Sequence, residues 1–317
     1  MANFWKKLPI PFLALAPMQD VTDFVFREII SEAAKPDVMF TEFTNVDSIF
    51  SKGHNKAVQN LRYSEKQRPV VAQLWGINPE NFYKSAKLLK ELKFDGIDIN
   101  MGCPDKAVVS RGAGAALIKN QKLAKEIINA VKEGAGKLPV SVKTRIGFDK
   151  VVTEKWIAFL LEQKIAVLTV HVRLAKEKFK GVANWDEMRK VVSLKNKISP
   201  DTIIIGNGDI KSYKEALEKH EKYKVDGIMI GRGIFSNPWV FEKTLTPKVR
   251  ETQEHLDLFS KHAKKFSEEW GSTKNYEMIK KFVGMYINKF KGSAAVRNKI
   301  MRCKTYLQME KVIKDLG

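Results

Sequence analysis

The run Asn100-Met101-Gly102-Cys103-Pro104 places an amide, a flexible residue and a thiol directly after a short apolar stretch, Gly96–Ile99. That stretch predicts a buried strand, and in parallel α/β proteins the carboxyl end of a strand is where chemistry takes place. Gly102 allows a tight turn and Pro104 fixes the next φ, so we expect the thiol of Cys103 to point out of the strand end. Such a thiol can donate a proton or attack an electrophile. The alternative is that Cys103 is a small buried hydrophobic residue, as most free cysteines are.

Polar residues or glycines follow seven further apolar stretches in the same way. A single polar residue at a strand end would mean little, but their presence at every strand end favours a common site. These strand-end residues include Pro17, Met18, Gln19, Gln73, Lys143, Arg145, His171, Asn207, Gly208, Asp209, Gly231 and Arg232.

Two glycine-rich turns, Asn207-Gly208-Asp209 and Gly231-Arg232-Gly233, follow the last two stretches. In barrel enzymes this is the usual phosphate site, where backbone N–H groups and a basic side chain hold the phosphate. FMN fits this prediction, because it has one phosphate and a ring whose polar edge Gln73, Lys143 and His171 can contact. The chain has no GxGxxG fingerprint after its first strand, no HExxH pair and no nucleophile elbow, which argues against Rossmann, metal and serine-hydrolase sites.

Eight apolar stretches alternate with amphipathic ones, which predicts eight parallel strands joined by helices. The expected strands are Phe12–Ala16, Val38–Glu42, Val70–Leu74, Gly96–Ile99, Val140–Lys143, Val167–His171, Thr202–Ile205 and Gly227–Ile230. The expected helices between them are Asp23–Ala34, Glu80–Leu92, Gln121–Glu133, Thr153–Gln163, Trp185–Leu194 and Ser212–Tyr223. Eight such units predict an α/β fold, a (β/α)8 TIM barrel, over residues 1–244. After Phe241 the strand pattern stops, and helices over Glu254–Trp270, Tyr276–Phe290 and Ser293–Leu316 predict a small all-α domain over residues 245–317.

The chain carries 56 Lys+Arg against 36 Asp+Glu, a formal net charge of +20. This charge favours a polyanionic partner such as nucleic acid over a membrane surface, although a lysine-rich composition alone would also produce it. The two cysteines exclude a disulfide framework and an all-cysteine metal cage, and they fit a cytoplasmic protein. No stretch reaches the roughly 20 apolar residues of a membrane helix, and the apolar N-terminal run is expected to be a first strand rather than a signal peptide.

These residues together resemble the tRNA-dihydrouridine synthase family. Leu15-Ala16-Pro17-Met18 resembles its opening motif, and Ile97-Asp98-Ile99-Asn100-Met101-Gly102-Cys103-Pro104 resembles its signature. Val140-Ser141-Val142-Lys143-Thr144-Arg145, Asn207-Gly208-Asp209-Ile210 and Asp226-Gly227-Ile228-Met229-Ile230-Gly231-Arg232-Gly233 follow in the family's order. The resemblance covers about the first three quarters of the chain, and the helical tail is similar only in kind. Val172, Leu174 and Asn184 depart from the residues usual in the family, and we expect them near the substrate mouth.

The resemblance implies an FMN enzyme that reduces the C5–C6 double bond of uridine in tRNA and is reloaded by NADPH, with NADH also possible. It implies that Cys103 is the catalytic proton donor and that Asn100 and Arg145 bind the substrate uracil. The implied FMN-binding residues are Pro17, Met18, Gln19, Gln73, Lys143, His171, Asn207, Gly208, Asp209, Gly231 and Arg232.

Thr41-Glu42-Phe43 is similar to the corresponding sequence of the subgroup that modifies position sixteen of the D-loop. We also expect the protein to be a monomer and to need no metal. Two alternatives stay open at this point. One is an FMN barrel acting on a free pyrimidine or another small molecule, and the other is a non-catalytic RNA-binding protein.

Overall fold

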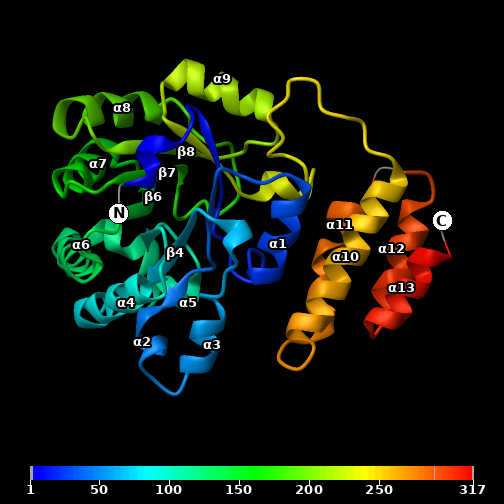
Figure 1. Cartoon of the computed structure of the whole chain (residues 1–317). Coiled ribbons are helices and arrows are strands. Elements are labelled where there is room, and N and C mark those ends of the chain that lie inside the picture. The colour runs from blue at the N-terminus through cyan, green and yellow to red at the C-terminus, as the bar shows by residue number, and fades with distance from the viewer. Residues whose placement is uncertain (1–2, 289, 316–317) are drawn as a thin grey trace.

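The computed structural model describes residues 3–288 and 290–315. Eight of its strands form a closed parallel barrel, in which β2 pairs with both β1 and β4 and so completes the ring. The strands of the barrel are β1 (Phe12–Leu15), β2 (Val38–Phe40), β4 (Val70–Trp75), β5 (Gly96–Met101), β6 (Val140–Gly147), β7 (Val167–Leu174), β8 (Ile203–Asn207) and β9 (Gly227–Ile230). The predicted TIM barrel is therefore confirmed (Figure 1).

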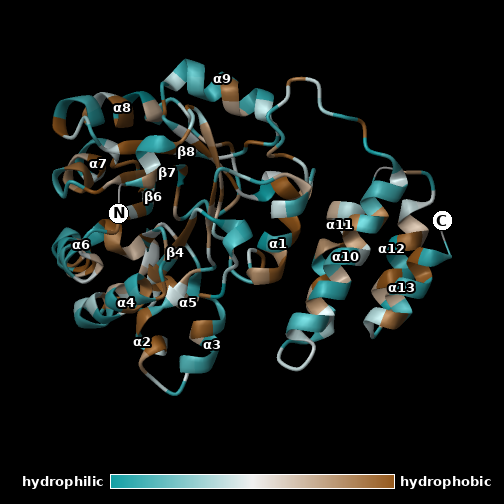
Figure 2. Cartoon of the chain, in the orientation of Figure 1, coloured by the Kyte–Doolittle hydropathy of each residue, from teal (hydrophilic) through white to brown (hydrophobic). Residues whose placement is uncertain are grey.

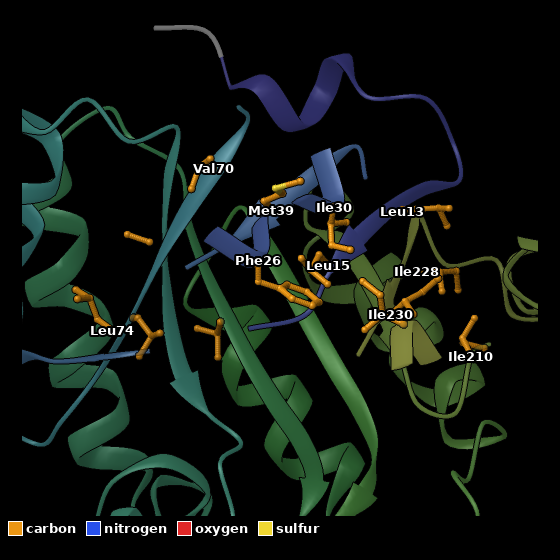
Figure 3. Packing of buried hydrophobic residues seen from close by; sticks show 14 of the residues in the cluster. Leu13, Leu15, Phe26, Ile30, Met39, Val70, Leu74, Ile210, Ile228 and Ile230 are labelled. Atoms are coloured by element: carbon orange, nitrogen blue, oxygen red, sulfur yellow. The ribbon is translucent and has the colours of Figure 1, made fainter. Parts of the chain in front are cut away.

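Helices connect the strands and cover the outside of the barrel. They are α1 (Phe24–Ala33), α4 (Pro79–Glu91), α6 (Gln121–Ala135), α7 (Thr153–Glu162), α8 (Glu187–Ile198) and α9 (Tyr213–Tyr223). Asp23 caps α1 by accepting the N–H of Phe26 at 2.9 Å, and Ser212 caps α9 in the same manner. Figure 3 shows Phe26 and Ile30 of α1 beside Leu15 of β1, where helix and strand bury their apolar faces against each other.

The connection after β2 is the least regular part of the barrel. It contains a two-residue strand that the sequence analysis missed, β3 (Thr44–Asn45), which pairs with β4 outside the ring. The short helices α2 (Val46–Ile49) and α3 (His54–Gln59) follow. Two residues are too few to show the alternation of apolar and polar residues that predicts a strand. Only the pairing with β4 identifies β3 as a strand.

The inside of the barrel changes from apolar to polar along the strands. At the amino ends a cluster around Ala14, Phe12 and Phe40 fills the interior, and Trp5 from η1 (Phe4–Lys7) closes that end, 5.7 Å from the ring of Phe12. Toward the carboxyl ends the inward positions hold polar residues. Because successive strand residues alternate between the two faces, Asp98 and Asn100 point inward whereas Ile97 and Ile99 contact the helices.

The chain continues past the barrel as a set of helices. After β9 come η4 (Arg232–Phe235), α10 (Thr252–Trp270), η5 (Tyr276–Phe282), α11 (Val283–Tyr286), α12 (Ser293–Arg302) and α13 (Tyr306–Lys314). We call the segment from α10 to α13 the C-terminal helices. They lie beside α1 in Figure 1, and in Figure 2 α10 carries both hydrophilic and hydrophobic residues, as a helix with one packed face does. The boundary at residue 244 stays a prediction.

Two of the expected tail helices differ from the structure. The helix expected over Tyr276–Phe290 is the 3₁₀ helix η5 followed by one turn of α11, and Ile287 ends it. The helix expected over Ser293–Leu316 is divided at Cys303, because Thr305 starts a new helix by accepting the N–H of Gln308. Leu316 lies outside the described residues. None of the described helices is long and apolar enough to cross a membrane.

Candidate active site

A cavity of about 1360 Å³ opens at the carboxyl ends of the strands. All the site residues expected from the sequence line it. They are Pro17, Met18, Gln19, Gln73, Asn100, Cys103, Lys143, Arg145, His171, Asn207, Gly208, Asp209, Gly231 and Arg232. The cavity is also lined by four aromatic residues, Phe43, Trp75, Phe179 and Phe235.

A chain of hydrogen bonds runs through the barrel to the thiol loop. Ser141 Oγ donates to Asp98 at 2.5 Å, and Gln73 Nε2 donates to the other oxygen of Asp98 at 2.7 Å. Gln73 Oε1 then accepts from Asn100 Nδ2 at 3.0 Å. Burial raises the pKa of Asp98 to about 6. The hydrogen bond from Gln73 to this carboxyl group fixes the orientation of the Gln73 amide. The sequence analysis predicted no role for Asp98.

Asn100 holds the loop that carries Cys103. Its Oδ1 accepts the backbone N–H of Gly102 at 3.1 Å and of Cys103 at 2.9 Å. Gly102 is needed here for close approach, because a Cβ atom would lie 3.2 Å from the backbone of Thr144. Burial raises the pKa of the Cys103 thiol, so the sulfur keeps its proton near neutral pH.

Gly114 supports the same loop from behind. It has φ +58°, and a Cβ atom at this position would lie 2.8 Å from the carbonyl oxygen of Cys103. The backbone N–H of Ala115 donates to that same oxygen at 3.0 Å. Only glycine satisfies both the backbone conformation and this contact.

Lys143 lines the same cavity. Its ammonium donates to Asn207 Oδ1 at 3.3 Å, and Asn207 is itself held by donating to the carbonyl oxygen of Met229 at 2.8 Å. Burial, with Arg145 nearby, lowers the pKa of Lys143 to about 8. A ligand that offers negative charge or strong acceptors to this ammonium would offset that cost.

Cations surround His171. Arg173 donates to His171 Nε2 at 3.2 Å, which assigns the ring proton to Nδ1. Burial and the charges of Arg145, Lys143, Arg173 and Arg232 hold the pKa of His171 well below its usual value. His171 is therefore a neutral hydrogen-bond donor in the cavity.

Arg173 also lines the cavity, although no role was expected for it from the sequence. It is 2 % exposed and donates to Gly181 O at 2.7 Å and to Asp209, which also lies 3.5 Å from Arg232. The strand period identifies it, because residues two apart point to the same face and His171 points inward.

Arg145 lies between the thiol loop and the outer rim. Its Nε donates to Gly102 O at 2.8 Å, and its Nη1 donates to the carbonyl oxygens of Leu174 and Lys178, each at 3.0 Å. Among the described residues these bonds leave Nη2 without a partner, so that nitrogen can donate to a ligand. Within residues 3–288 and 290–315, no group of three or more His, Cys, Asp and Glu side chains is placed to hold a metal ion.

A protein-family model described as dihydrouridine synthase matches residues 14–315. The chain belongs to the dihydrouridine synthase family. It is 42% identical over 316 residues to the "Probable tRNA-dihydrouridine synthase" of Staphylococcus aureus (strain COL), covering 99% of this chain and 95% of the relative. It is also 42% identical over 318 residues to the "Probable tRNA-dihydrouridine synthase 2" of Bacillus subtilis (strain 168), covering 99% of this chain and 96% of the relative. The prediction of a flavin-dependent oxidoreductase is thereby confirmed.

The family match reaches further than expected. The resemblance was expected over the first three quarters of the chain, whereas the matched region includes all four α-helices from α10 to α13.

Solved structures agree with the barrel fold. Morphinone reductase in complex with tetrahydroNAD aligns with a TM-score of 0.53 and 13% identity, over 76% of this chain and 88% of that chain. A variant of NCR from Zymomonas mobilis aligns with a TM-score of 0.51 and 18% identity, over 78% of this chain and 94% of that chain. At this level of identity the likeness concerns the fold alone.

Proposed function

We propose that this protein reduces the C5–C6 double bond of a uridine in the D-loop of tRNA, with FMN as the bound flavin and NADPH as the reductant. One observation carries the proposal: a chain of this family brings its thiol, Lys143 and the turn that bears Arg232 to one cavity. The names of the relatives at 42% identity support tRNA as the substrate.

The residues present fit FMN. The cavity volume of about 1360 Å³ leaves room for a flavin and a base together. Gly231 and Arg232 start η4 at one side of the cavity, where a helix start and a guanidinium suit a phosphate. Gln73, Lys143 and His171 offer donors to the polar edge of the ring, and the lowered pKa of Lys143 indicates an ammonium that needs an acceptor.

When bound, FMN would supply the electrons that reduce the pyrimidine, and NADPH would restore them. The part of the protein is to donate the proton and to hold the base. Cys103 would protonate C5 of the uracil, and its raised pKa favours this acid role over a thiolate nucleophile. Arg145 Nη2 and the second N–H of Asn100 Nδ2 would bind the oxygens of the uracil edge.

Charge supports an RNA substrate rather than a free pyrimidine. The net charge is +20, and Lys291, Lys299, Arg302 and Lys304 are exposed on the C-terminal helices. Phosphate contacts from such residues would hold a folded RNA by its backbone and shape. The target uridine must leave the RNA stack to reach Cys103, and the aromatic rings of Phe43 and Trp75 at the cavity offer it a stacking surface.

The modified position is proposed as position sixteen of the D-loop, because Thr41-Glu42-Phe43 is similar to the subgroup acting there. Phe43 lines the cavity, whereas Thr41 and Glu42 are buried beneath it.

Incubation of the purified protein with FMN, NADPH and an unmodified tRNA transcript tests the activity. We expect the bands of bound flavin in the absorbance spectrum and a tRNA fragment heavier by two hydrogen atoms. Reduction of free uridine at a comparable kcat/KM would favour the small-molecule enzyme instead. A colourless protein that binds the transcript without changing its mass would favour a non-catalytic RNA-binding protein.

A further inference from the structure

Two consecutive residues of the C-terminal helices contact two separate segments of the cavity wall. The ammonium of Lys281 donates to the carbonyl oxygen of Asp20, and the ring of Phe282 stacks on the ring of Phe235 with their centroids 6.2 Å apart. Asp20 and Phe235 both line the cavity. Lys281 and Phe282 do not, so they act on the cavity only through these neighbours.

The first of the two segments is the turn over residues 17–23, which joins β1 to α1 and carries Pro17, Met18 and Gln19. The turn is held by two other parts of the chain: the N–H of Asp20 donates to Glu42, which follows β2, and Arg27 of α1 donates to Thr22 O at 2.6 Å. Asp20 has φ +59°, in the left-handed region, which Asp adopts more readily than most other non-glycine residues.

The C-terminal helices supply the remaining restraints on this turn. Besides the bond from Lys281 to Asp20 O, Lys274 forms an ion pair with Asp23 at 2.9 Å, with both side chains mostly buried. The turn is therefore fixed between the barrel and the tail, at a sequence separation of more than 250 residues.

The second segment is η4, which begins at the turn formed by Gly231 and Arg232. Phe235 at its end packs against Phe282, and Phe282 also stacks on Phe26 of α1 at 5.2 Å. One aromatic side chain of the tail thus contacts both α1 and the helix that follows the proposed phosphate turn. Such rings in contact restrict each other's movement.

We propose that Lys281 and Phe282 are positioning residues of the flavin site, so that the C-terminal helices help to hold the flavin in addition to any contact with RNA. This rests on the proposed function, since it takes FMN as the ligand of the cavity. The consequence is that flavin affinity depends on residues outside the barrel, although no flavin contact is assigned to them.

Titration of flavin-free protein with FMN, followed by flavin fluorescence, tests the proposal. We expect Lys281→Met to weaken binding by up to roughly tenfold; the net value of one hydrogen bond to a charged group is the upper limit, because the exposed Lys281 acts on the flavin only through the turn. Lys281→Arg retains a donor and should restore most of the affinity. Lys264→Met is the matched control, because Lys264 is an exposed lysine of α10 that pairs with Glu268 of the same helix, and it should leave the affinity unchanged.

A second variant and a second measurement test the same proposal. Phe282→Leu should weaken FMN binding in the same direction, since it removes the ring contact with Phe235. In flavin-free Lys281→Met, backbone amides of residues 18–22 should exchange with solvent faster than in Lys264→Met.

The proposal is overturned if Lys281→Met and Lys264→Met have equal affinity and equal exchange, or if Phe282→Leu binds FMN as the unaltered protein does. An unaltered protein that binds no FMN would instead overturn the proposed function, and this inference with it.

Discussion

Replacement of Lys143 by methionine should abolish the pH dependence of FMN binding that we expect of the unaltered protein. Burial lowers the pKa of Lys143 to about 8 in the flavin-free protein, so about nine tenths of the side chains are charged at pH 7 and about one tenth at pH 9. If FMN binds only the charged form, its dissociation constant should be about tenfold higher at pH 9 than at pH 7.

The same shift predicts the sign of a stability change. Because the folded state releases this proton at a lower pH than the unfolded chain, the unfolded chain binds more protons between about pH 8 and pH 10. The flavin-free protein should therefore gain stability from this group as the pH rises through that window, and Lys143→Met should lack the gain.

Fluorescence titrations with FMN between pH 7 and pH 9 provide the assay. At pH 7 we expect Lys143→Met to bind FMN roughly 10- to 100-fold more weakly, through loss of one charged hydrogen bond. Its dissociation constant should then stay flat with pH, whereas Lys125→Met, an exposed lysine of α6, should keep both the affinity and the slope. A flat profile in the unaltered protein, or an equal slope in Lys143→Met, would refute the assignment of Lys143 to the flavin.

Three further changes have defined outcomes. Cys103→Ala should retain FMN and tRNA binding but lose roughly 10²–10⁴-fold in the rate of uridine reduction, measured in single turnovers, and near-normal rates would assign the proton to another donor. Lys299→Gln should lower the slope of log K against log salt for tRNA binding by about 0.7–0.9, while Lys125→Gln on the barrel surface leaves it unchanged; equal slopes would exclude this lysine as a phosphate contact. Burial and the neighbouring Asp23 raise the pKa of Glu42 to about 7, so the folded state holds a proton that the unfolded chain releases near pH 4.5. Urea titrations should therefore show Glu42→Gln becoming more stable relative to the unaltered protein as the pH rises from about 5 to 7, by about 2 kcal/mol, and a constant difference would contradict the shift.

The barrel and most of its cavity could be predicted because short stretches of the sequence carry the necessary patterns. Each strand is a short apolar run, and each run ends in residues that suit a polar cavity, such as Asn100 and Asn207. Strand order follows from the chain order in a barrel of this kind, so placing the strand ends also places the side chains. Arg173 and Asp98 could have been found by the same rule, two residues from His171 and Asn100.

The remaining features depend on contacts between distant parts of the chain. Cys103 and Gly114 meet only because two turns pack on each other, and Lys281 meets Asp20 only because the C-terminal helices dock beside α1. No local pattern around Lys281 or Phe282 distinguishes them from other core and surface residues of an amphipathic helix. The division of the last predicted helix at Cys303 was missed because the apolar spacing continues through it.

The proposed reaction can be tested by mapping dihydrouridine in RNA from cells with and without this protein. We expect that loss of the protein removes dihydrouridine from a D-loop position of tRNA, with position sixteen as the proposed site. It also predicts that the gene for the unaltered protein restores the modification, whereas a Cys103→Ala variant does not. A tRNA dihydrouridine map that is the same in both kinds of cell would contradict it.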